Sequence, residues 1–271
     1  MSGGVRLLCL DIDGTLLNSR KELPDENVEA VRYARERGVE SVIVTGRSVK
    51  GTEFLFEALD LPRSAVCLNG GLILYRGETI YQRAMTPEQV EQIVAVVERY
   101  ESHVYLATAE FNITNVRLTA EDRRALQSGS LRARQVTCDG YARLRQAAAA
   151  HSAEIIKASV LENDGDNFER IKRALLDLDL FRVEKSDTHY VDICARDSGK
   201  ASGVARLAEH LGIPLSEVMC IGDNENDADM LRAAGVGVAM GNAVEASRAA
   251  ADFVTADNDA CGVAKAIRHF I

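Results

Sequence analysis

The feature that most constrains this chain is the alternation of short buried apolar runs with segments of helical pattern. Val5–Ile12 is almost wholly apolar, as expected of a parallel strand that is covered on both faces. A helical pattern follows over Pro24–Arg37, with acids in its first turn and Gly38 as a stop signal. Ser41–Val44 is typical of a second buried strand. This alternation predicts a right-handed, parallel α/β sheet.

After Gln82 the pattern changes to that of an α+β segment. Thr86-Pro87-Glu88-Gln89 forms a capping box with Pro at the first helical position, and half-polar strands follow, as at His103–Thr108. From Lys200 onward the alternation of buried strands and helices returns. We therefore expect a discontinuous core over residues 1–83 and 192–271, interrupted by an α+β insert over residues 84–191.

Composition excludes several classes of protein. The 271 residues include 41 Asp or Glu against 32 Lys or Arg, a net charge of −9, and 46% are apolar, so extended disorder is excluded. The acidic balance argues against a nucleic-acid binder, which would need clustered basic residues. The Arg-rich stretch Arg123–Arg134 has few aromatic neighbours and is expected to be a solvated face. A small phosphorylated ligand remains compatible, because it needs only a few local cations or a metal.

The chain lacks the pattern of a signal peptide, and no apolar stretch approaches the roughly 20 residues that cross a bilayer. Its six cysteines lie far apart, several of them within apolar runs. Reduced, buried thiols are therefore expected rather than a disulfide framework. These observations predict a cytoplasmic protein without a membrane partner, and they leave a monomer and a homodimer equally open.

Three of the buried runs end in unusually polar residues. Asp11–Thr15 follows the first run, Thr45-Gly46-Arg47 follows the second, and Gly222–Asp227 follows a later one. In an open parallel sheet, ligands bind in the crevice at the carboxyl ends of the strands. The three polar ends, although far apart in the sequence, are therefore predicted to converge on one site.

The residue types at these ends indicate a metal. Asp11, Asp13 and Asp223 bring several carboxylates together without an equal number of local cations, which would raise their pKa values unless a cation lay among them. Hard oxygen ligands with no His or Cys nearby favour Mg²⁺ over zinc.

The same ends offer groups for a phosphate. Thr45 and the backbone N–H groups at Gly46 and after Asp13 provide donors at helix N-termini, and Lys200 adds positive charge at the start of a helix. An Asp in such a site can act as a nucleophile and form an aspartyl-phosphate.

At this point the residues resemble a known family, the haloacid dehalogenase-like superfamily, and within it the Cof-type phosphatases. Four motifs in order carry this resemblance, which covers essentially the whole chain: Asp11-Ile12-Asp13-Gly14-Thr15, Thr45-Gly46-Arg47, Gly199-Lys200 and Gly222-Asp223-Asn224-Glu225-Asn226-Asp227. Asn69-Gly70-Gly71 also matches. Cys261 departs from the family, which often has an acidic residue there. The resemblance implies a doubly wound, mostly parallel Rossmann-like core with an inserted α+β cap that selects the leaving group.

The resemblance also implies roles for the acidic residues. Asp11 looks like the nucleophile, and Asp13 like the general acid that protonates the leaving alcohol and then activates water. The Mg²⁺ ligands would be the carboxylates of Asp11 and Asp223 and the backbone carbonyl of Asp13. Asp227 would support the metal from behind these ligands.

The phosphate would be held by Thr45, Gly46, Lys200 and Asn226, with Lys200 also orienting Asp11. Arg47 and Asn69 are weaker candidates: Arg47 either touches the substrate or pairs with surface acids, and Asn69 is either a turn residue or a site residue.

Simpler roles exist for several of these residues. Asp11 and Asp13 could belong to an ordinary turn after a strand, and Lys200 could be a solvated lysine at a helix start. The motif order favours the functional roles.

Taken together, the resemblance implies a Mg²⁺-dependent phosphomonoesterase that acts on small phosphorylated metabolites through an aspartyl-phosphate. Two alternatives remain at this stage: a phosphomutase with the same motifs, and a non-enzymatic switch that accepts a phosphoryl group. Sugar phosphates, pyridoxal phosphate, nucleotides and flavin mononucleotide are all open as substrates.

Overall fold

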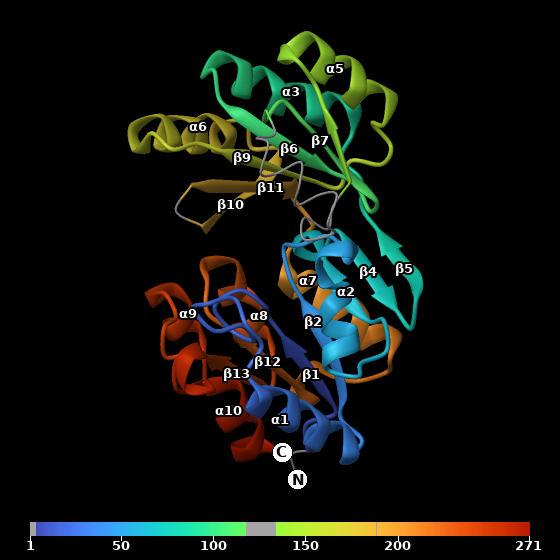
Figure 1. Ribbon diagram of the computed structural model, residues 1–271, viewed down its shortest axis with the longest axis vertical. Coiled ribbons are helices and arrows are strands. Elements are labelled where there is room, and N and C mark those ends of the chain that lie inside the picture. The colour runs from blue at the N-terminus through green and yellow to red at the C-terminus, as the bar shows by residue number, and fades with distance from the viewer. Residues whose placement is uncertain (1–3, 118–133, 188) are drawn as a thin grey trace. The chain divides into compact units, whose positions relative to one another are not determined.

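The computed structural model describes residues 4–117, 134–187 and 189–271, so that nearly all of the Arg-rich stretch Arg123–Arg134 lies outside the described residues. The chain divides into two compact units, each built around one sheet (Figure 1). The first unit comprises Met1–Gly46, Thr52–Ile80 and Lys200–Ile271, and the second comprises Arg47–Gly51 and Tyr81–Gly199.

An eight-stranded sheet in the order β14-β13-β12-β1-β2-β3-β4-β5 forms the centre of the first unit. Its strands are β1 (Leu7–Leu10), β2 (Glu40–Val44), β3 (Ala65–Cys67), β4 (Leu72–Tyr75), β5 (Glu78–Gln82), β12 (Val218–Gly222), β13 (Val236–Ala239) and β14 (Phe253–Val254). The central strand β1 pairs in parallel with β12 on one side and β2 on the other, and every residue of β1 and β12 is buried. The predicted parallel α/β sheet is confirmed.

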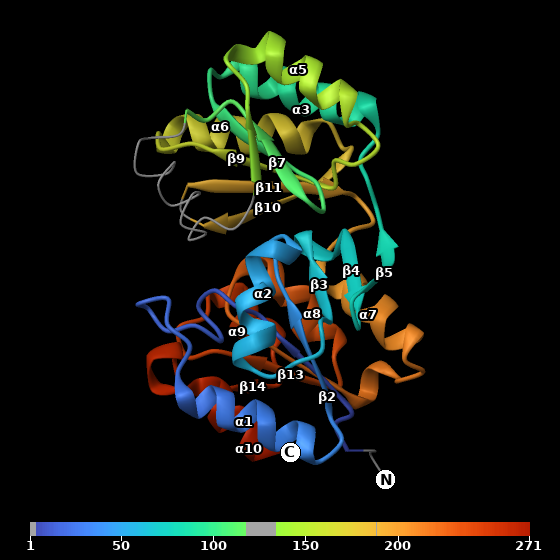
Figure 2. The same cartoon turned by 45° about the vertical axis from the view of Figure 1, so that its right-hand side comes forward.

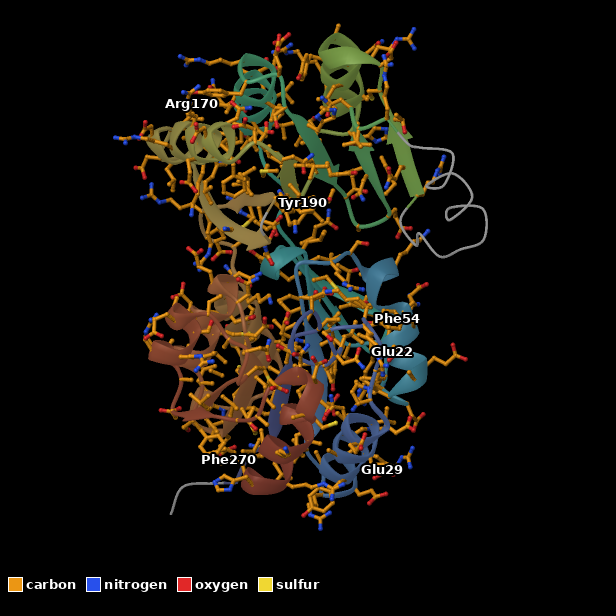
Figure 3. All side chains as sticks on the ribbon, turned by 60° about the vertical axis from the view of Figure 1, so that its left-hand side comes forward. Glu22, Glu29, Phe54, Arg170, Tyr190 and Phe270 are labelled. Atoms are coloured by element: carbon orange, nitrogen blue, oxygen red, sulfur yellow. The ribbon has the colours of Figure 1, made fainter. Side chains whose placement is uncertain are left out.

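Helices cover this sheet. They are α1 (Asp25–Glu36), α2 (Val49–Ala58), α7 (Lys200–His210), α8 (Ala228–Ala233), α9 (Glu245–Ala250) and α10 (Gly262–Phe270), with 3-10 turns η1 (Leu68–Gly70), η2 (Leu215–Glu217), η3 (Glu225–Asp227) and η4 (Asn258–Ala260). α1 packs beside α10, whereas α7 packs against α8 and β3 (Figure 2). α1 ends just before Gly38, whose φ of 81° only glycine adopts readily, as the sequence predicts. Figure 3 labels Glu29 on α1 and Phe270 at the end of α10.

A six-stranded sheet in the order β10-β11-β9-β6-β7-β8 forms the second unit. Its strands are β6 (His103–Ala107), β7 (Phe111–Thr114), β8 (Arg134–Thr137), β9 (Lys157–Leu161), β10 (Phe181–Asp187) and β11 (Tyr190–Ala195). The helices α3 (Pro87–Arg99), α5 (Gly140–Ala150) and α6 (Gly165–Asp177) lie on one face of the sheet (Figures 1 and 2). The predicted capping box at Thr86 and Gln89 starts α3.

The second sheet is antiparallel except between β7 and β8, which pair in parallel. β7 and β8 have no counterpart among the predicted strands. One face of this sheet and the three helices enclose a core that includes Ile93, Leu106, Leu144 and Ile171. Among the described helices, none combines the length and apolar composition that crossing a membrane requires. Five of the six cysteine thiols are buried, as expected.

Candidate functional site

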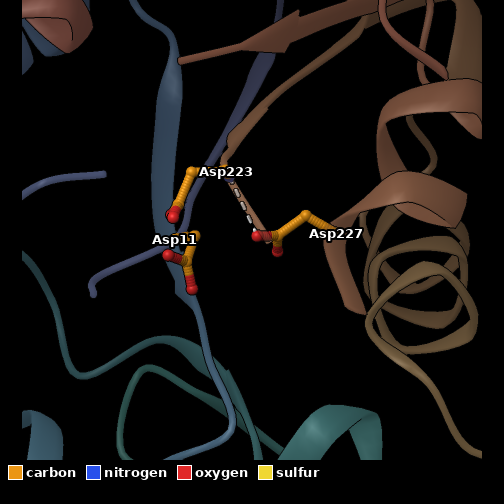
Figure 4. A group of neighbouring side chains, drawn as sticks. All are labelled: Asp11, Asp223 and Asp227. Carbon is orange, nitrogen blue, oxygen red and sulfur yellow. Dashed lines mark hydrogen bonds between the residues drawn. The ribbon is translucent and has the colours of Figure 1, made fainter. Parts of the chain in front are cut away.

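The ends of β1 and β12 bring three carboxylates together. Asp11 directly follows β1, Asp223 directly follows β12, and Asp227 ends the η3 turn four residues later. One carboxylate oxygen from each lies within 4.8 Å of the others (Figure 4). Because β1 and β12 are parallel neighbours, their ends meet at the same edge of the sheet. The predicted convergence of these strand ends is therefore observed.

Asp227 is held in place by both of its oxygens. Its Oδ2 accepts hydrogen bonds from the backbone N–H groups of Asp223 and Asn224, at 3.0 and 2.9 Å. Its Oδ1 accepts one from the Lys200 ammonium at 2.6 Å. The carboxylate lies so close to the Gly222 backbone that any side chain at that position would collide with it. Asp227 therefore fixes the turn that carries Asp223.

Lys200 links Asp11, which follows β1, to Asp227 in the turn after β12. It begins α7, is only 2% exposed, and its Nζ lies 2.6 Å from Asp11 Oδ1 as well as 2.6 Å from Asp227 Oδ1. A buried ammonium requires such partners, since its desolvation is otherwise costly. The contact leaves Asp11 with one oxygen that Lys200 does not hold.

Asp223 is positioned by the loop after β1. The Thr15 hydroxyl donates a hydrogen bond to Asp223 Oδ1 at 2.7 Å. Glycine is required at position 14 for two reasons: its φ is 82°, which other residues rarely adopt, and a Cβ there would collide with the Asp223 carboxylate. The Asn242 side chain, which follows β13, donates to the Gly14 carbonyl at 2.8 Å and steadies this loop.

The site contains three carboxylates and one ammonium, and this excess of acids affects the pKa values of Asp11, Asp223 and Lys200. Burial raises the pKa of Asp11 well above its usual value; Lys200 opposes this rise, whereas the other two carboxylates add to it. Burial and the Asp227 carboxylate raise the pKa of Asp223 to about 6, although the hydrogen bond from Thr15 acts in the opposite direction. Burial alone would lower the pKa of Lys200, but Asp11 and Asp227 together raise it above its ordinary value.

These residues fit a divalent metal ion with oxygen ligands. Three carboxylates face one ammonium, and burial together with the neighbouring carboxylates raises the pKa of Asp11 and of Asp223 although Lys200 acts in the opposite direction. Asp11 and Asp223 are the better placed ligands, because both oxygens of Asp227 already accept hydrogen bonds. Carboxylate oxygens without thiolate or imidazole neighbours are the ligand set of hard cations.

Three further predicted residues lie together beyond the end of β2. The Thr45 carbonyl accepts a hydrogen bond from the Asn69 N–H at 3.1 Å, and the Asn226 amide donates to Asn69 Oδ1 at 3.3 Å. All three are buried, and Asn69 has a φ of 51°, a left-handed conformation that Asn tolerates better than most residues. Asn69 thus links Thr45 to the turn that carries Asp227.

Asp13 and Arg47 are not among the buried side chains of this site. The Asp13 side chain is 41% exposed and forms an ion pair with Lys21 at 3.2 Å, and it is not part of the carboxylate group described above. Arg47 donates to the Gly51 carbonyl at 3.4 Å and belongs, with Gly51, to the second unit. The preceding residue, Gly46, ends the first segment of the first unit.

Three residues that contact the site or its loop were not predicted from the sequence: Thr15, Lys21 and Asn242. Asn242 could have been found, because it closely follows the buried strand β13 and so lies at the same sheet edge. Thr15 belongs to the motif that begins at Asp11. Its partner Asp223 is 208 residues away along the chain, and no local pattern reveals that contact.

Comparisons with known proteins bear on this site. A family model described as haloacid dehalogenase-like hydrolase matches residues 8–267. The chain is similar to Phosphatase YwpJ of Bacillus subtilis (strain 168), with 30% identity over 98% of this chain and 100% of the relative. It is also similar to Pyridoxal phosphate phosphatase YbhA of Escherichia coli (strain K12), with 31% identity over 97% of each chain. A solved structure of a sugar phosphatase of HAD subclass IIB has a TM-score of 0.82 and 25% identity over 98% of this chain and 99% of that one.

Proposed function

Since this chain belongs to the haloacid dehalogenase-like hydrolases, we propose that it is a Mg²⁺-dependent phosphatase that hydrolyses phosphomonoesters of small metabolites, such as sugar phosphates, through an aspartyl-phosphate. One observation carries the proposal: Asp11 is one of three neighbouring carboxylates, and Lys200 binds one of its two oxygens. A nucleophile, an orienting cation and a set of oxygen ligands thus lie together.

Asp11 is the nucleophile in this proposal. Lys200 binds Oδ1 at 2.6 Å, which fixes the carboxylate and directs Oδ2 toward the substrate. A lone pair of Oδ2 forms a bond to phosphorus while the bond from phosphorus to the ester oxygen breaks. The phosphoryl group is then covalently attached to Asp11, and the organic part leaves as an alcohol.

Asp13 moves the protons. In its acid form it gives a proton to the departing ester oxygen, and as a carboxylate it then removes a proton from the water that attacks the aspartyl-phosphate. As the water oxygen bonds to phosphorus, the bond from phosphorus to Asp11 Oδ2 breaks, which releases inorganic phosphate and restores the Asp11 carboxylate. Its partly exposed position gives it access to both the leaving group and water. The ion pair with Lys21 must loosen when Asp13 takes up its proton, because a neutral carboxyl group no longer attracts the ammonium.

The phosphate is bound by groups from three segments. Thr45 and Gly46 follow β2, Lys200 begins α7, and Asn226 lies in η3. The Mg²⁺ ligands are the carboxylates of Asp11 and Asp223 together with the Asp13 backbone carbonyl, and a bound Mg²⁺ would neutralise these acids and offset charge on the phosphoryl oxygens. Asp227 supports this arrangement by holding the backbone of the Asp223 turn.

The α+β insert selects the leaving group in this proposal, with residues 84–191 forming a cap domain and the rest of the chain forming the catalytic core. The relatives described above act on different substrates: one is a pyridoxal phosphate phosphatase and another is a sugar phosphatase. Both substrates are small phosphorylated metabolites, and this class is the one we assign to the chain.

The test is phosphate release from a panel of sugar phosphates and pyridoxal phosphate, measured with and without Mg²⁺. Asp11→Asn should lower turnover by about three orders of magnitude or more, since it removes the nucleophile while keeping the shape of the side chain. Asp229→Asn is a matched control on α8, because Asp229 lies outside the carboxylate group of the site and forms a solvent-exposed ion pair with Arg232. Equal turnover in wild-type protein and Asp11→Asn would refute the mechanism.

A further inference from the structure

A cavity lies at the opposite end of β2 from Thr45. It has a volume of about 700 Å³ and lies wholly within the first unit. Its wall contains three arginines, two carboxylates and one serine: Arg35, Arg63, Arg76, Glu40, Asp60 and Ser41. The candidate catalytic residues follow the ends of the parallel strands, whereas this cavity opens where β2 begins.

The strand pairing explains why this space exists. β2 starts at Glu40 and pairs with β1 from that residue through Ile43, but its pairing with β3 begins only where Ile43 meets Ala65. In the described chain, the first part of β2 therefore has no strand neighbour on the β3 side. The segment before β3 and the Arg76-Gly77 turn between β4 and β5 border the space instead.

Two polar atoms in the cavity wall are buried without a hydrogen-bond partner among the described residues. They are the hydroxyl oxygen of Ser41, a residue only 2% exposed, and Oε1 of Glu40. Such groups destabilise a fold unless something satisfies them. A carboxylate oxygen only accepts hydrogen bonds, whereas a hydroxyl both donates and accepts. A ligand with at least one hydrogen-bond donor would satisfy the Glu40 oxygen, and the Ser41 hydroxyl could pair with either a donor or an acceptor.

The arginines can bind an anionic group of the same ligand. Arg35 pairs with Asp60 at 3.1 Å, Arg63 with Glu53 at 2.9 Å, and Arg76 lies 3.9 Å from a Glu40 oxygen. These ion pairs are partly or largely exposed to solvent, where such pairs are weak, so an incoming anion can compete for the guanidinium groups. The wall itself contains three cations and two acids, and Glu53, the partner of Arg63, adds a third acid beside it. Guanidinium groups bind phosphate oxygens in a bidentate manner.

We propose that this cavity is a second ligand site, which binds a phosphate monoester whose organic part carries a hydroxyl or amino group. The phosphate binds the guanidinium groups of Arg63 and Arg76, and the organic donor satisfies Glu40 Oε1 and the Ser41 hydroxyl. This proposal is independent of the catalytic one, because none of the residues that line the cavity belongs to the proposed catalytic machinery.

The experiment follows the backbone amide resonances of Gly38, Ser41 and Gly77 by NMR in the full chain, with EDTA present to prevent turnover. The probes are methyl phosphate, glycerol 1-phosphate and glycerate. Glycerol 1-phosphate should shift these resonances saturably and bind about three- to tenfold more tightly than methyl phosphate, because its hydroxyls add hydrogen bonds. Glycerate, which offers a carboxylate in place of the phosphate, should bind more weakly than glycerol 1-phosphate.

Two variants separate this site from general anion binding. Arg63→Glu combined with Arg76→Glu should abolish the saturable shifts, whereas Arg268→Glu should keep them, because Arg268 lies outside the cavity and forms only a loose, exposed pair with Glu29. Ser41→Ala should weaken glycerol 1-phosphate binding several-fold without lowering the melting temperature, since the hydroxyl has no partner in the described fold. A purely structural hydroxyl would lower the melting temperature and leave binding unchanged.

The proposal is overturned if the three resonances do not shift saturably in wild-type protein, or if the double variant shifts as the Arg268→Glu control does. Equal affinity for glycerate and glycerol 1-phosphate would also overturn it, because the site would then bind a carboxylate as well as a phosphate.

Discussion

Each unit of this molecule buries a group of charged side chains, and the two groups differ in their balance. The acidic cluster of the first unit has three carboxylates and one ammonium: Asp11, Asp223, Asp227 and Lys200. The balanced cluster of the second unit has two acids and two bases: Asp192, Glu184, Lys157 and Arg182. Burial raises the pKa of Cys194 to about 12, and all four members of the balanced cluster act on this thiol, the acids raising its pKa and the bases lowering it.

This difference separates a structural role from a binding role. In the balanced cluster, Lys157 lies 2.6 Å from Asp192, which also accepts a hydrogen bond from Ser159 at 2.7 Å. Each buried acid there has a basic partner. In the acidic cluster, one ammonium is shared by two carboxylates, and Asp223 has a raised pKa. Buried charge without a partner is costly, so the excess acids indicate a site that a cation completes.

Among the changes that compare the two clusters, the largest expected effect comes from removing the shared lysine. Lys200→Met should lower phosphate release by about a hundredfold or more, because Asp11 loses the ammonium that orients it and the phosphate loses a cation. Initial rates with a sugar phosphate at saturating Mg²⁺ measure this effect. Lys265→Met, on the surface helix α10, is the matched control and should retain full rates. An active Lys200→Met enzyme would contradict the role assigned to the acidic cluster.

Breaking the balanced cluster should chiefly affect stability. Lys157→Met leaves the Asp192 carboxylate buried without its ammonium, which should reduce the free energy of unfolding by about 3–5 kcal/mol. Urea unfolding followed by circular dichroism measures this loss. The double variant Lys157→Met/Asp192→Leu should recover most of it, since no buried charge is then left uncompensated. If the double variant is as unstable as the single one, the charge balance is not what stabilises this cluster.

Stabilisation by Mg²⁺ should depend on pH because of Asp223. The pKa of Asp223 is about 6 in the metal-free fold, above the usual value of 3.8. The folded protein therefore holds this proton more tightly than the unfolded chain does, and the free energy of unfolding falls as pH rises from about 4 through about 6. Mg²⁺ binds the carboxylate that forms over this range. At a concentration of 100 Kd, Mg²⁺ should stabilise the protein by about 2.7 kcal/mol at pH 7.5, and much less at pH 5.

Thermal melts at the two pH values, with and without Mg²⁺, make this measurement. Asp192→Asn serves as the control from the balanced cluster and should keep the pH-dependent gain. A gain from Mg²⁺ that is equal at pH 5 and pH 7.5 would show that Asp223 is not among the ligands.

The smallest effect should come from the hydrogen bond that orients Asp223. Thr15→Val removes the donor at 2.7 Å and should weaken Mg²⁺ binding by about 1 kcal/mol, or roughly fivefold. Thr15→Ser keeps the hydroxyl and should bind as the wild type does. Calorimetric titration of both variants resolves this difference, and identical affinities would mean that the contact does not prepare Asp223 for the metal.

The sequence predicts much of this architecture because parallel buried strands have a strong local pattern. β1 and β12 contain no charged residue, and β2 ends in the apolar run Val42–Val44. The polar residues that follow these strands converge because sheet topology brings parallel strand ends together. The strands β7 and β8 were missed, since each is short and mixes polar with apolar residues.

Contacts between distant residues account for the rest. The Lys157 side chain, for example, is buried against Asp192, 35 residues further along the chain. Its burial depends on the pairing of β9 with β11, which no local pattern specifies. Likewise, a DxDGT motif indicates a site, but the contacts of Thr15 and Gly14 with Asp223 appear only once β1 lies beside β12.

Calorimetric titration of Mg²⁺ into the full chain at pH 7.5 tests the central claim most directly. The account predicts saturable binding at one site in wild-type protein, loss of that binding in Asp223→Asn, and unchanged binding in Asp192→Asn. Mg²⁺ binding that survives in Asp223→Asn, or no binding in the wild type, would contradict the claim that the excess carboxylates of the first unit form a cation site.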